Sequence, residues 1–427
     1  MVIVKLLYAD SDGVLYEDPE LGAAAWTGAE TVPFPEQEAV PLPPGSDLVL
    51  LPERAPVGWA AGRPVKDVRR LQGGGKLFAV AAVLPAGFTR TLLPAYRVYG
   101  RPPDLGLFGY TAVGARNGEF FAAAVHTDEE YRWNPLLYND LTLPRRIKAK
   151  RRQFPKNRLV EHLAHCACAY HCLTAQNIFY ARWEAGLPVS PACNADCLGC
   201  ISRPPSGWCP PAGCCPAPQE RIGFVPTVAE VVELGTSHLQ DGVEPIISFG
   251  QGCEGEPLLQ AQLLVAAVRG IRKATGRGTI NLNTNGGDPA ALAALGEAGL
   301  DSVRISLISA REETYLAYHR PRGFNLADVR RSLAAARARG VFVSLNLLVL
   351  PGLTDREEEV KALLELLQSE KVHMVQLRNL SADPYRLLTN LPPARGGILG
   401  VGHLIARLRE IPGLRVGNFT IGSPKRY

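Results

Sequence analysis

The sequence predicts an α/β fold, a partial (β/α)6 TIM-like barrel with a smaller, mostly β N-terminal domain. From residue 187 onward, short runs of apolar and β-branched residues alternate with longer amphipathic ones, as expected for parallel strands connected by helices. Before residue 140, Pro and Gly separate short apolar runs, which is typical of β-strands and irregular loops. The N-terminal domain is therefore expected over residues 1–140, with candidate strands at 47–51, 76–84 and 120–125.

The composition is that of a globular protein. The chain has 427 residues, of which 46% are hydrophobic and 20% charged, and this argues against a mainly disordered or fibrous protein. It contains no apolar run of roughly 18 residues, and its first residues lack the pattern of a secretory signal. We therefore expect a cytoplasmic protein that does not cross a membrane.

Residues 141–186 are interpreted as a basic linker followed by a helix over 159–186 that carries cysteine and histidine residues. Removing the eight basic residues between 145 and 158 from the net charge of +5 leaves the rest of the chain at −3, so the positive charge is local. A solvated linker is the commoner outcome for such a run, and RNA binding is the weaker alternative. The eight residues are Arg145, Arg146, Lys148, Lys150, Arg151, Arg152, Lys156 and Arg158.

Six strands, each followed by a helix, are expected in the barrel, which we assign to residues 187–382. Thr227 and Asp288 suit the residue that caps the start of a helix, and Gly340 suits a helix end. Residues 383–427 are expected to complete the last unit. The strands are expected at 187–190, 245–250, 279–284, 302–308, 341–350 and 373–380. The helices are expected at 227–240, 257–275, 289–298, 325–339, 355–370 and 398–409.

All ten cysteines lie between residues 166 and 253, and clustered thiols in a chain without a leader indicate metal or redox chemistry. Cys193, Cys197 and Cys200 follow the first expected strand of the barrel. Three thiolates can hold three irons of a four-iron cluster, and the fourth iron is then open to a small molecule. A zinc loop is the alternative for these three residues.

The spacing C-x3-C-x2-C after a first strand resembles the signature of the radical S-adenosylmethionine (SAM) superfamily. The following strand ends resemble the family's SAM-binding elements in order, and the resemblance covers residues 187–382. The family often has an aromatic residue just before the third cysteine, where it packs on the adenine of SAM. This chain has Gly199 at that position and so departs from the family. The residues that the resemblance assigns to SAM are Gly255, Glu256, Pro257, Asn283, Thr284, Asn285, Arg304, Ser306 and Arg378.

The resemblance implies an enzyme whose reduced 4Fe-4S cluster cleaves SAM to methionine and a 5′-deoxyadenosyl radical. That radical would abstract a hydrogen atom from the substrate, and the electron would come from a donor such as flavodoxin or ferredoxin. The substrate cannot be identified from the sequence. A protein, peptide or RNA fits the N-terminal domain and the basic segment slightly better than a small metabolite does.

Six further cysteines flank the signature, and we interpret them as an auxiliary site for a second iron-sulfur cluster or zinc. The alternative, to which we give equal weight, is that these cysteines are buried in the core and bind no metal. Cys253, next to the expected SAM loop, is interpreted as a packed loop residue, with a thiol facing the substrate as the alternative. The six residues of the auxiliary site are Cys166, Cys168, Cys172, Cys209, Cys214 and Cys215.

A function of another class is a noncatalytic, zinc-dependent RNA-binding protein built from the cysteines and the basic segment. It would bind tetrahedral zinc and show RNA affinity that falls with salt. It leaves the resemblance at the later strand ends unexplained, and we therefore favour the enzyme.

Overall fold

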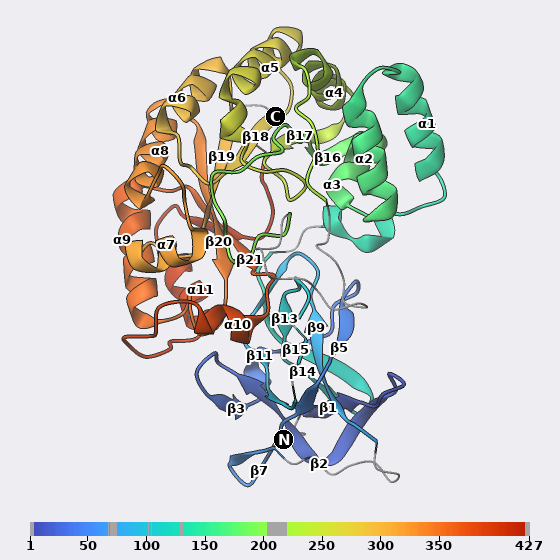
Figure 1. Cartoon of the computed structure of the whole chain (residues 1–427), viewed down its shortest axis with the longest axis vertical. Coiled ribbons are helices and arrows are strands. Elements are labelled where there is room, and N and C mark those ends of the chain that lie inside the picture. The colour runs from blue at the N-terminus through green and yellow to red at the C-terminus, as the bar shows by residue number, and fades with distance from the viewer. Residues whose placement is uncertain are drawn as a thin grey trace.

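A computed structural model shows two sheets, one above the other in Figure 1, with helices around the upper one. The structure describes residues 4–66, 68, 75–100, 102–103, 105–128, 131–202 and 220–422. In this part of the chain, no helix combines the length and the apolar character needed to span a membrane.

The N-terminal region is mostly β, as predicted. Thirteen of its strands form one antiparallel sheet, whose main path runs β10-β15-β14-β1-β2-β7-β8, and β6 pairs separately with β12. Its strands are β1 (Lys5–Ala9), β2 (Leu15–Trp26), β3 (Thr31–Pro33), β4 (Ala39–Pro41), β5 (Asp47–Leu51), β6 (Arg54–Pro56), β7 (Gly58–Ala60), β8 (Arg63–Val65), β9 (Phe78–Val83), β10 (Phe88–Arg90), β11 (Leu93–Pro94), β12 (Tyr96–Val98), β13 (Tyr110–Thr111), β14 (Val113–Arg116) and β15 (Glu119–His126).

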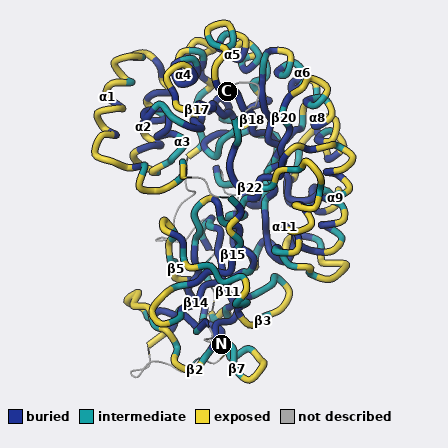
Figure 2. Tube along the Cα trace, turned by 180° about the vertical axis from the view of Figure 1, so that it is seen from behind, coloured by how far each residue is buried: buried dark blue, intermediate teal, exposed yellow. Residues whose placement is uncertain are grey.

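The second sheet is parallel throughout and runs in chain order from β16 to β22, which confirms the partial (β/α) barrel. It has seven strands rather than the expected six, because a short strand follows the last helix. Its interior is almost fully buried, and the outer faces of the surrounding helices are exposed (Figure 2). The strands are β16 (Arg182–Gly186), β17 (Val243–Phe249), β18 (Thr279–Thr284), β19 (Ser302–Leu307), β20 (Phe342–Val349), β21 (Met374–Asn379) and β22 (Arg415–Gly417).

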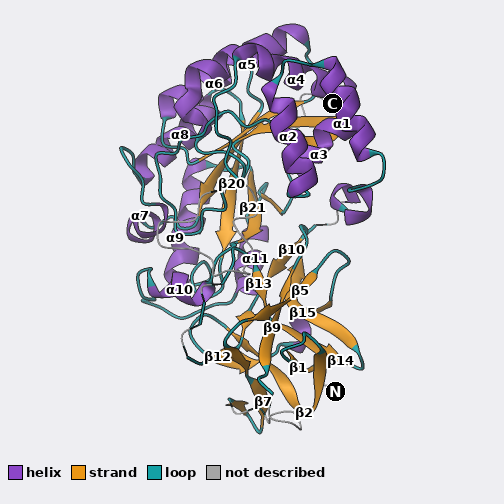
Figure 3. Cartoon of the chain, turned by 45° about the vertical axis from the view of Figure 1, so that its right-hand side comes forward, coloured by secondary structure: helices purple, strands orange, loops and turns teal. Residues whose placement is uncertain are grey.

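Helices cover the outside of this parallel sheet (Figure 3). The caps lie where the sequence predicts them: the Thr227 hydroxyl accepts from the Glu230 amide, and the Asp288 carboxylate accepts from the Ala291 amide. Gly340 has a φ of +70° just after α8, as a helix-ending glycine requires. The helices are α4 (Val228–Asp241), α5 (Ala261–Ala274), α6 (Pro289–Ala298), α7 (Glu312–His319), α8 (Leu326–Ala338), α9 (Glu357–Glu370), α10 (Pro384–Thr389) and α11 (Val401–Arg409).

The segment between the two sheets differs from the prediction. The basic run is not a linker but mostly the helix α1 (Leu143–Gln153), with Leu143 and Ile147 buried and most of its basic side chains exposed. The single helix expected over 159–186 is divided into α2 (Arg158–Ala169), α3 (Leu173–Tyr180) and β16. The expected strand at 187–190 is wrong, because the chain pairs with β17 earlier and residues 187–190 already form the loop that follows.

Arg90 fixes the N-terminal sheet to the barrel. Its guanidinium is fully buried and donates to the carbonyl oxygens of Tyr110 (3.1 Å), Val349 (3.3 Å) and Leu380 (2.8 Å). The Asn379 side chain accepts from the Arg90 amide at 2.9 Å. Val349 and Asn379 end β20 and β21, so the N-terminal sheet lies against the carboxyl ends of barrel strands, where the loops that carry chemistry begin.

His238 of α4 gives the fold a pH dependence. It is 2% exposed, its Nε2 lies 2.8 Å from the Trp183 carbonyl oxygen, and burial lowers its pKa from 6.5 to about 4. Above pH 6.5 this imidazole is neutral in both states. As the pH falls below 6.5 the unfolded chain binds the proton first, so the free energy of unfolding should fall by about 2 kcal/mol between pH 7 and 5.

Urea unfolding of the wild type and of His238→Gln across that pH range tests this expectation. The glutamine amide can still donate to the Trp183 carbonyl but does not titrate, so the variant should lose this part of the pH slope. Equal slopes in the two proteins would contradict it.

Candidate active site

The cysteine loop, residues 190–200, lies between β16 and the neighbouring strand ends. Cys193, Cys197 and Cys200 line one cavity of about 550 Å³. Backbone hydrogen bonds hold the loop on two sides, because the Gly255 amide donates to the Ser190 carbonyl (2.7 Å) and the Leu198 amide donates to the Tyr318 carbonyl (3.0 Å). The structure thus brings the three signature thiols to one cavity, as the sequence predicts.

Gly255 allows this loop to approach the end of β17. A Cβ atom on residue 255 would lie 1.9 Å from the Ala192 carbonyl oxygen, far inside any allowed contact. The next amide, that of Glu256, donates to the same Ala192 oxygen at 2.8 Å. The two loops therefore pair through their backbones, and only glycine leaves room for that pairing.

Glu254 is a site residue that the sequence reasoning missed. Its buried carboxylate accepts from the amides of Val189 (2.8 Å), Ser190 (3.0 Å) and Gly250. Burial raises its pKa to about 8 despite these bonds. Glu254 thus anchors the start of the cysteine loop to the end of β17, and only its place one residue before a glycine hinted at this role.

Glu256 joins the ends of two neighbouring strands. Its carboxylate accepts from the Thr284 hydroxyl (2.6 Å), the Asn285 amide (2.8 Å) and the Leu258 amide (3.0 Å). Burial raises its pKa to about 7. Glu256 thus holds the loop after β17 against the end of β18, and it lines the cavity beside the three thiols.

Burial and mutual repulsion raise the pKa values of the Cys193 and Cys197 thiols, so as free thiols they are neutral. Two further side chains touch the signature cysteines: His319 Nδ1 lies 3.4 Å from Cys197 Sγ, and an Arg221 nitrogen lies 3.8 Å from Cys200 Sγ. Neither contact was predicted, because both partners are distant in sequence. The Arg221 guanidinium is a cation that would stabilise the Cys200 thiolate, which suits a cysteine that binds a metal, whereas burial lowers the pKa of His319 to about 3 and keeps it neutral.

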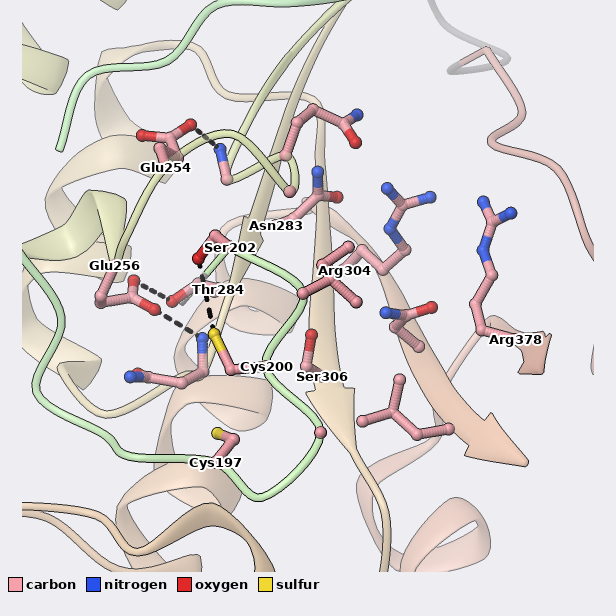
Figure 4. A pocket seen from close by; sticks show the side chains of 18 of the residues that line it. Cys197, Cys200, Ser202, Glu254, Glu256, Asn283, Thr284, Arg304, Ser306 and Arg378 are labelled. Carbon is pink, nitrogen blue, oxygen red and sulfur yellow. Dashed lines mark hydrogen bonds between the residues drawn. The ribbon is translucent and has the colours of Figure 1, made fainter. Parts of the chain in front are cut away.

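The remaining predicted site residues lie on other parts of the same cavity. Figure 4 shows Glu254, Glu256 and the cysteines on one side, and Arg304 and Arg378 on the other. The nine residues assigned to SAM from the sequence all line the cavity, together with Ala86 and Trp133 from the N-terminal part of the chain: they are Gly255, Glu256, Pro257, Asn283, Thr284, Asn285, Arg304, Ser306 and Arg378.

The family model described as "Radical SAM superfamily" matches residues 187–367. Over these residues the chain is similar to the radical SAM superfamily. It is 31% identical over 205 residues to GTP 3',8-cyclase of Limosilactobacillus fermentum, covering 46% of this chain and 53% of that enzyme. It is 35% identical over 175 residues to GTP 3',8-cyclase 2 of Mycobacterium tuberculosis, covering 40% and 43%. The chain thus spans about half the length of the curated relatives it matches.

Solved structures resemble this chain only in part. The crystal structure of Streptococcus suis SuiB bound to precursor peptide SuiA aligns with 61% of this chain and 53% of that one, with 11% identity and a TM-score of 0.38. The native anSMEcpe structure with bound AdoMet covers 46% and 52%, with 17% identity and a TM-score of 0.34.

The cavity contains buried polar atoms that suit a ligand such as SAM. Among the described residues, four side-chain atoms on its wall are buried without a hydrogen-bond partner: Asn283 Nδ2, Arg304 Nε, His319 Nε2 and Asn346 Oδ1. Unpaired buried donors and acceptors are costly, so they favour a polar occupant. Three thiols on one side and unpaired polar atoms around it fit a 4Fe-4S cluster with SAM.

Gly199, which departs from the family signature that the sequence resembles, has a structural explanation. A Cβ atom there would lie 2.7 Å from the Tyr318 hydroxyl and 2.9 Å from Leu380 Cδ1. Tyr318 is 1% exposed and lines the cavity. The cysteine loop therefore packs on an aromatic ring from α7, and an aromatic side chain at residue 199 would displace that ring.

The structure places the flanking cysteines that it describes in different environments, some buried and one exposed. Burial raises the pKa of Cys166 to about 12 and also raises that of Cys253, and the nearby Cys172 adds to both shifts. Cys253 is 5% exposed in the core and absent from the cavity lining, while Cys168 is exposed. Cys209, Cys214 and Cys215 lie outside the described residues.

Proposed function

We propose that this protein is a radical SAM enzyme that binds a 4Fe-4S cluster through Cys193, Cys197 and Cys200. The observation that supports this proposal most directly is that these thiols open onto the same cavity as Glu256 and the ends of β18 and β19. The cluster and SAM, when bound, supply a 5′-deoxyadenosyl radical for hydrogen abstraction. The zinc-dependent RNA-binding alternative does not account for a family match that extends over residues 187–367.

The residues of the chain position and shield the reacting groups. The exposed backbone around Gly255 and the Glu256 carboxylate are assigned to the methionine ammonium, because a buried carboxylate stabilises a cation. Asn283, Thr284, Asn285 and Ser306 are polar side chains on the adjoining wall and are assigned to the ribose side. Walls that exclude water would prevent a radical from reacting with solvent.

We infer that the N-terminal domain shapes the substrate side of the cavity. Ala86 and Trp133 line it, and Arg90 fixes the N-terminal sheet to the ends of β20 and β21. A protein, a peptide or RNA stays the proposed substrate class. The name of the relatives, GTP 3',8-cyclase, adds a nucleotide as a second candidate.

Cys166, Cys172 and Cys253 are the described residues that support an auxiliary site. We propose a second iron-sulfur cluster there, with Cys253 in place of the exposed Cys168. Within the described ranges, no three His, Cys, Asp or Glu side chains close around one metal ion. This holds for the signature cysteines as well, and a cluster spreads its thiolate ligands over several irons.

Reconstitution without oxygen tests the proposed function. The wild type should contain about four irons per chain for one cluster, or about eight with the auxiliary cluster. With dithionite it should convert SAM to 5′-deoxyadenosine, and without a reductant it should not. Zinc alone, with no cleavage after any reconstitution, would overturn the proposal.

A further inference from the structure

Arg304 and Arg378 extend into the cavity from β19 and β21, on the side remote from Cys197 and Cys200 (Figure 4). We propose that Arg378, together with Arg304, binds an anionic group of the substrate, a phosphate or a carboxylate, on this side of the cavity. The inference rests on the proposed function, because it assigns the opposite side to the cluster and SAM. It also moves these two arginines from SAM, where the sequence assigned them, to the substrate.

Arg378 is a partly buried cation whose charge is not compensated by a contact. Among the described residues it makes no hydrogen bond and no ion pair, although it lines the cavity. Glu184 and Asp128 are near enough to influence its pKa, but neither lies within the 4 Å of an ion pair. Burial and the neighbouring Arg304 lower its pKa to about 10, so Arg378 remains charged at neutral pH.

Arg304 is held in place by the barrel but keeps an unused donor. One of its terminal nitrogens donates to Gln376 Oε1 (2.5 Å) and to Thr420 Oγ1 (2.8 Å). The other lies 3.7 Å from Glu184. Its Nε is buried with no partner among the described residues, so part of the guanidinium can still donate to a ligand.

Glu184 does not neutralise both arginines. Its Oε1 already accepts from the Ser248 hydroxyl (2.6 Å) and from the Gln251 amide (2.9 Å). On this side of the cavity the two guanidinium groups thus share one acidic side chain of the wall, while Glu254 and Glu256 lie on the side of the cysteines (Figure 4). Guanidinium groups bind phosphates and carboxylates through paired hydrogen bonds, and such charge-assisted bonds are stronger inside a cavity than in water.

The two sides of the cavity carry different groups, which favours binding of SAM on one side and of the substrate on the other. The side with Gly255, Glu256 and Thr284 is continuous with the cysteine loop and carries the groups assigned to SAM. Trp133, which comes from the chain between the two sheets, also lines the cavity. A substrate anchored on the arginine side by its anion would present its other end toward the cluster, where the hydrogen atom is abstracted.

Calorimetric titration of the anaerobically reconstituted protein tests the anion site, at constant ionic strength in chloride. Pyrophosphate is the phosphate probe and malonate is the carboxylate probe. Arg378→Gln should weaken binding of the responding probe at least about tenfold. Arg378→Lys, which keeps the charge without the paired donors, should retain part of the affinity. Arg407→Gln, an exposed arginine that pairs only with Glu410 among the described residues, is the matched control and should bind like the wild type.

Two further readouts separate this site from other roles of Arg378. The melting temperature of Arg378→Gln should stay within a few degrees of the wild type, because no described contact is lost. Its affinity for SAM, measured by equilibrium dialysis, should also stay unchanged. Loss of SAM affinity with intact probe binding would overturn the inference and return Arg378 to SAM.

The probes also identify the source of the anion. A response to pyrophosphate alone supports a phosphate-bearing substrate, and a response to malonate alone supports a carboxylate-bearing one. If neither probe binds the wild type more tightly than Arg378→Gln, the inference is wrong. If a probe binds through Arg378 but the wild type binds no SAM, the anion site stands and the proposed function fails.

Discussion

Replacing Cys193, Cys197 or Cys200 individually by serine is expected to remove the iron of the signature cluster and to abolish SAM cleavage. Each thiol holds a different iron, so the loss of one ligand exposes a second iron to solvent and the cluster dissociates. Iron content should fall by about four per chain. 5′-Deoxyadenosine formation should fall to the level of the protein without reductant. Iron and sulfide assays, with chromatography of the nucleoside product, measure both effects.

Cys168→Ser is the matched control, because this thiol is exposed and is not among the cavity residues. It should keep both the iron and the cleavage activity. The signature variants also report on the auxiliary site, since iron that remains in them must be bound elsewhere. Unchanged iron content together with full cleavage in Cys197→Ser would show that the cysteine loop does not hold the catalytic cluster.

Gly255→Ala is expected to lower the rate of SAM cleavage about a hundredfold although no functional group is removed. The added Cβ would meet the Ala192 oxygen at 1.9 Å, so the cysteine loop and the end of β17 must separate by more than an ångström. A displacement of that size between reacting groups costs about two orders of magnitude. The overpacked loop should also lower the free energy of unfolding by about 1–3 kcal/mol.

SAM affinity, cleavage rate and thermal unfolding of the reconstituted variant check this expectation. Gly223→Ala is the control, because its Cβ would meet nothing within 4 Å. It should match the wild type in all three measurements. A Gly255→Ala variant with normal SAM affinity and normal cleavage would mean that the close approach of the two loops is not needed for catalysis.

The barrel was predictable because its local signals agree with its tertiary structure. Strand β18 (Thr279–Thr284) is short, with Ile280 and Leu282 alternating with polar residues, and the following helix begins at a capping residue, Asp288. The region 159–186 was not predictable in the same way. Its residues favour a helix, but Ala181 and Trp183 have φ values of +51° and +52°, and pairing with β17 converts the end of the segment into a strand.

The auxiliary cysteines illustrate a second limit. Cys168 and Cys172 stand four residues apart and were expected on one helical face, but α2 ends at Ala169 and Cys172 precedes α3. Cys172 therefore lies near Cys166 and Cys253, and Cys168 is exposed. The break between the helices, at a residue with a φ of +50°, His171, has no strong signal in the sequence.

The sequence by itself determined the class of this protein, because cluster ligation needs three thiols on one short loop and their spacing is a local property. It also determined the order of the barrel, since strand and helix periodicities are read residue by residue. Only the tertiary structure decided which distant groups meet: Glu254 with Ser190, Arg90 with the ends of β20 and β21, and Arg378 with Arg304. Such contacts depend on how the sheets curve and pack, which no single segment encodes.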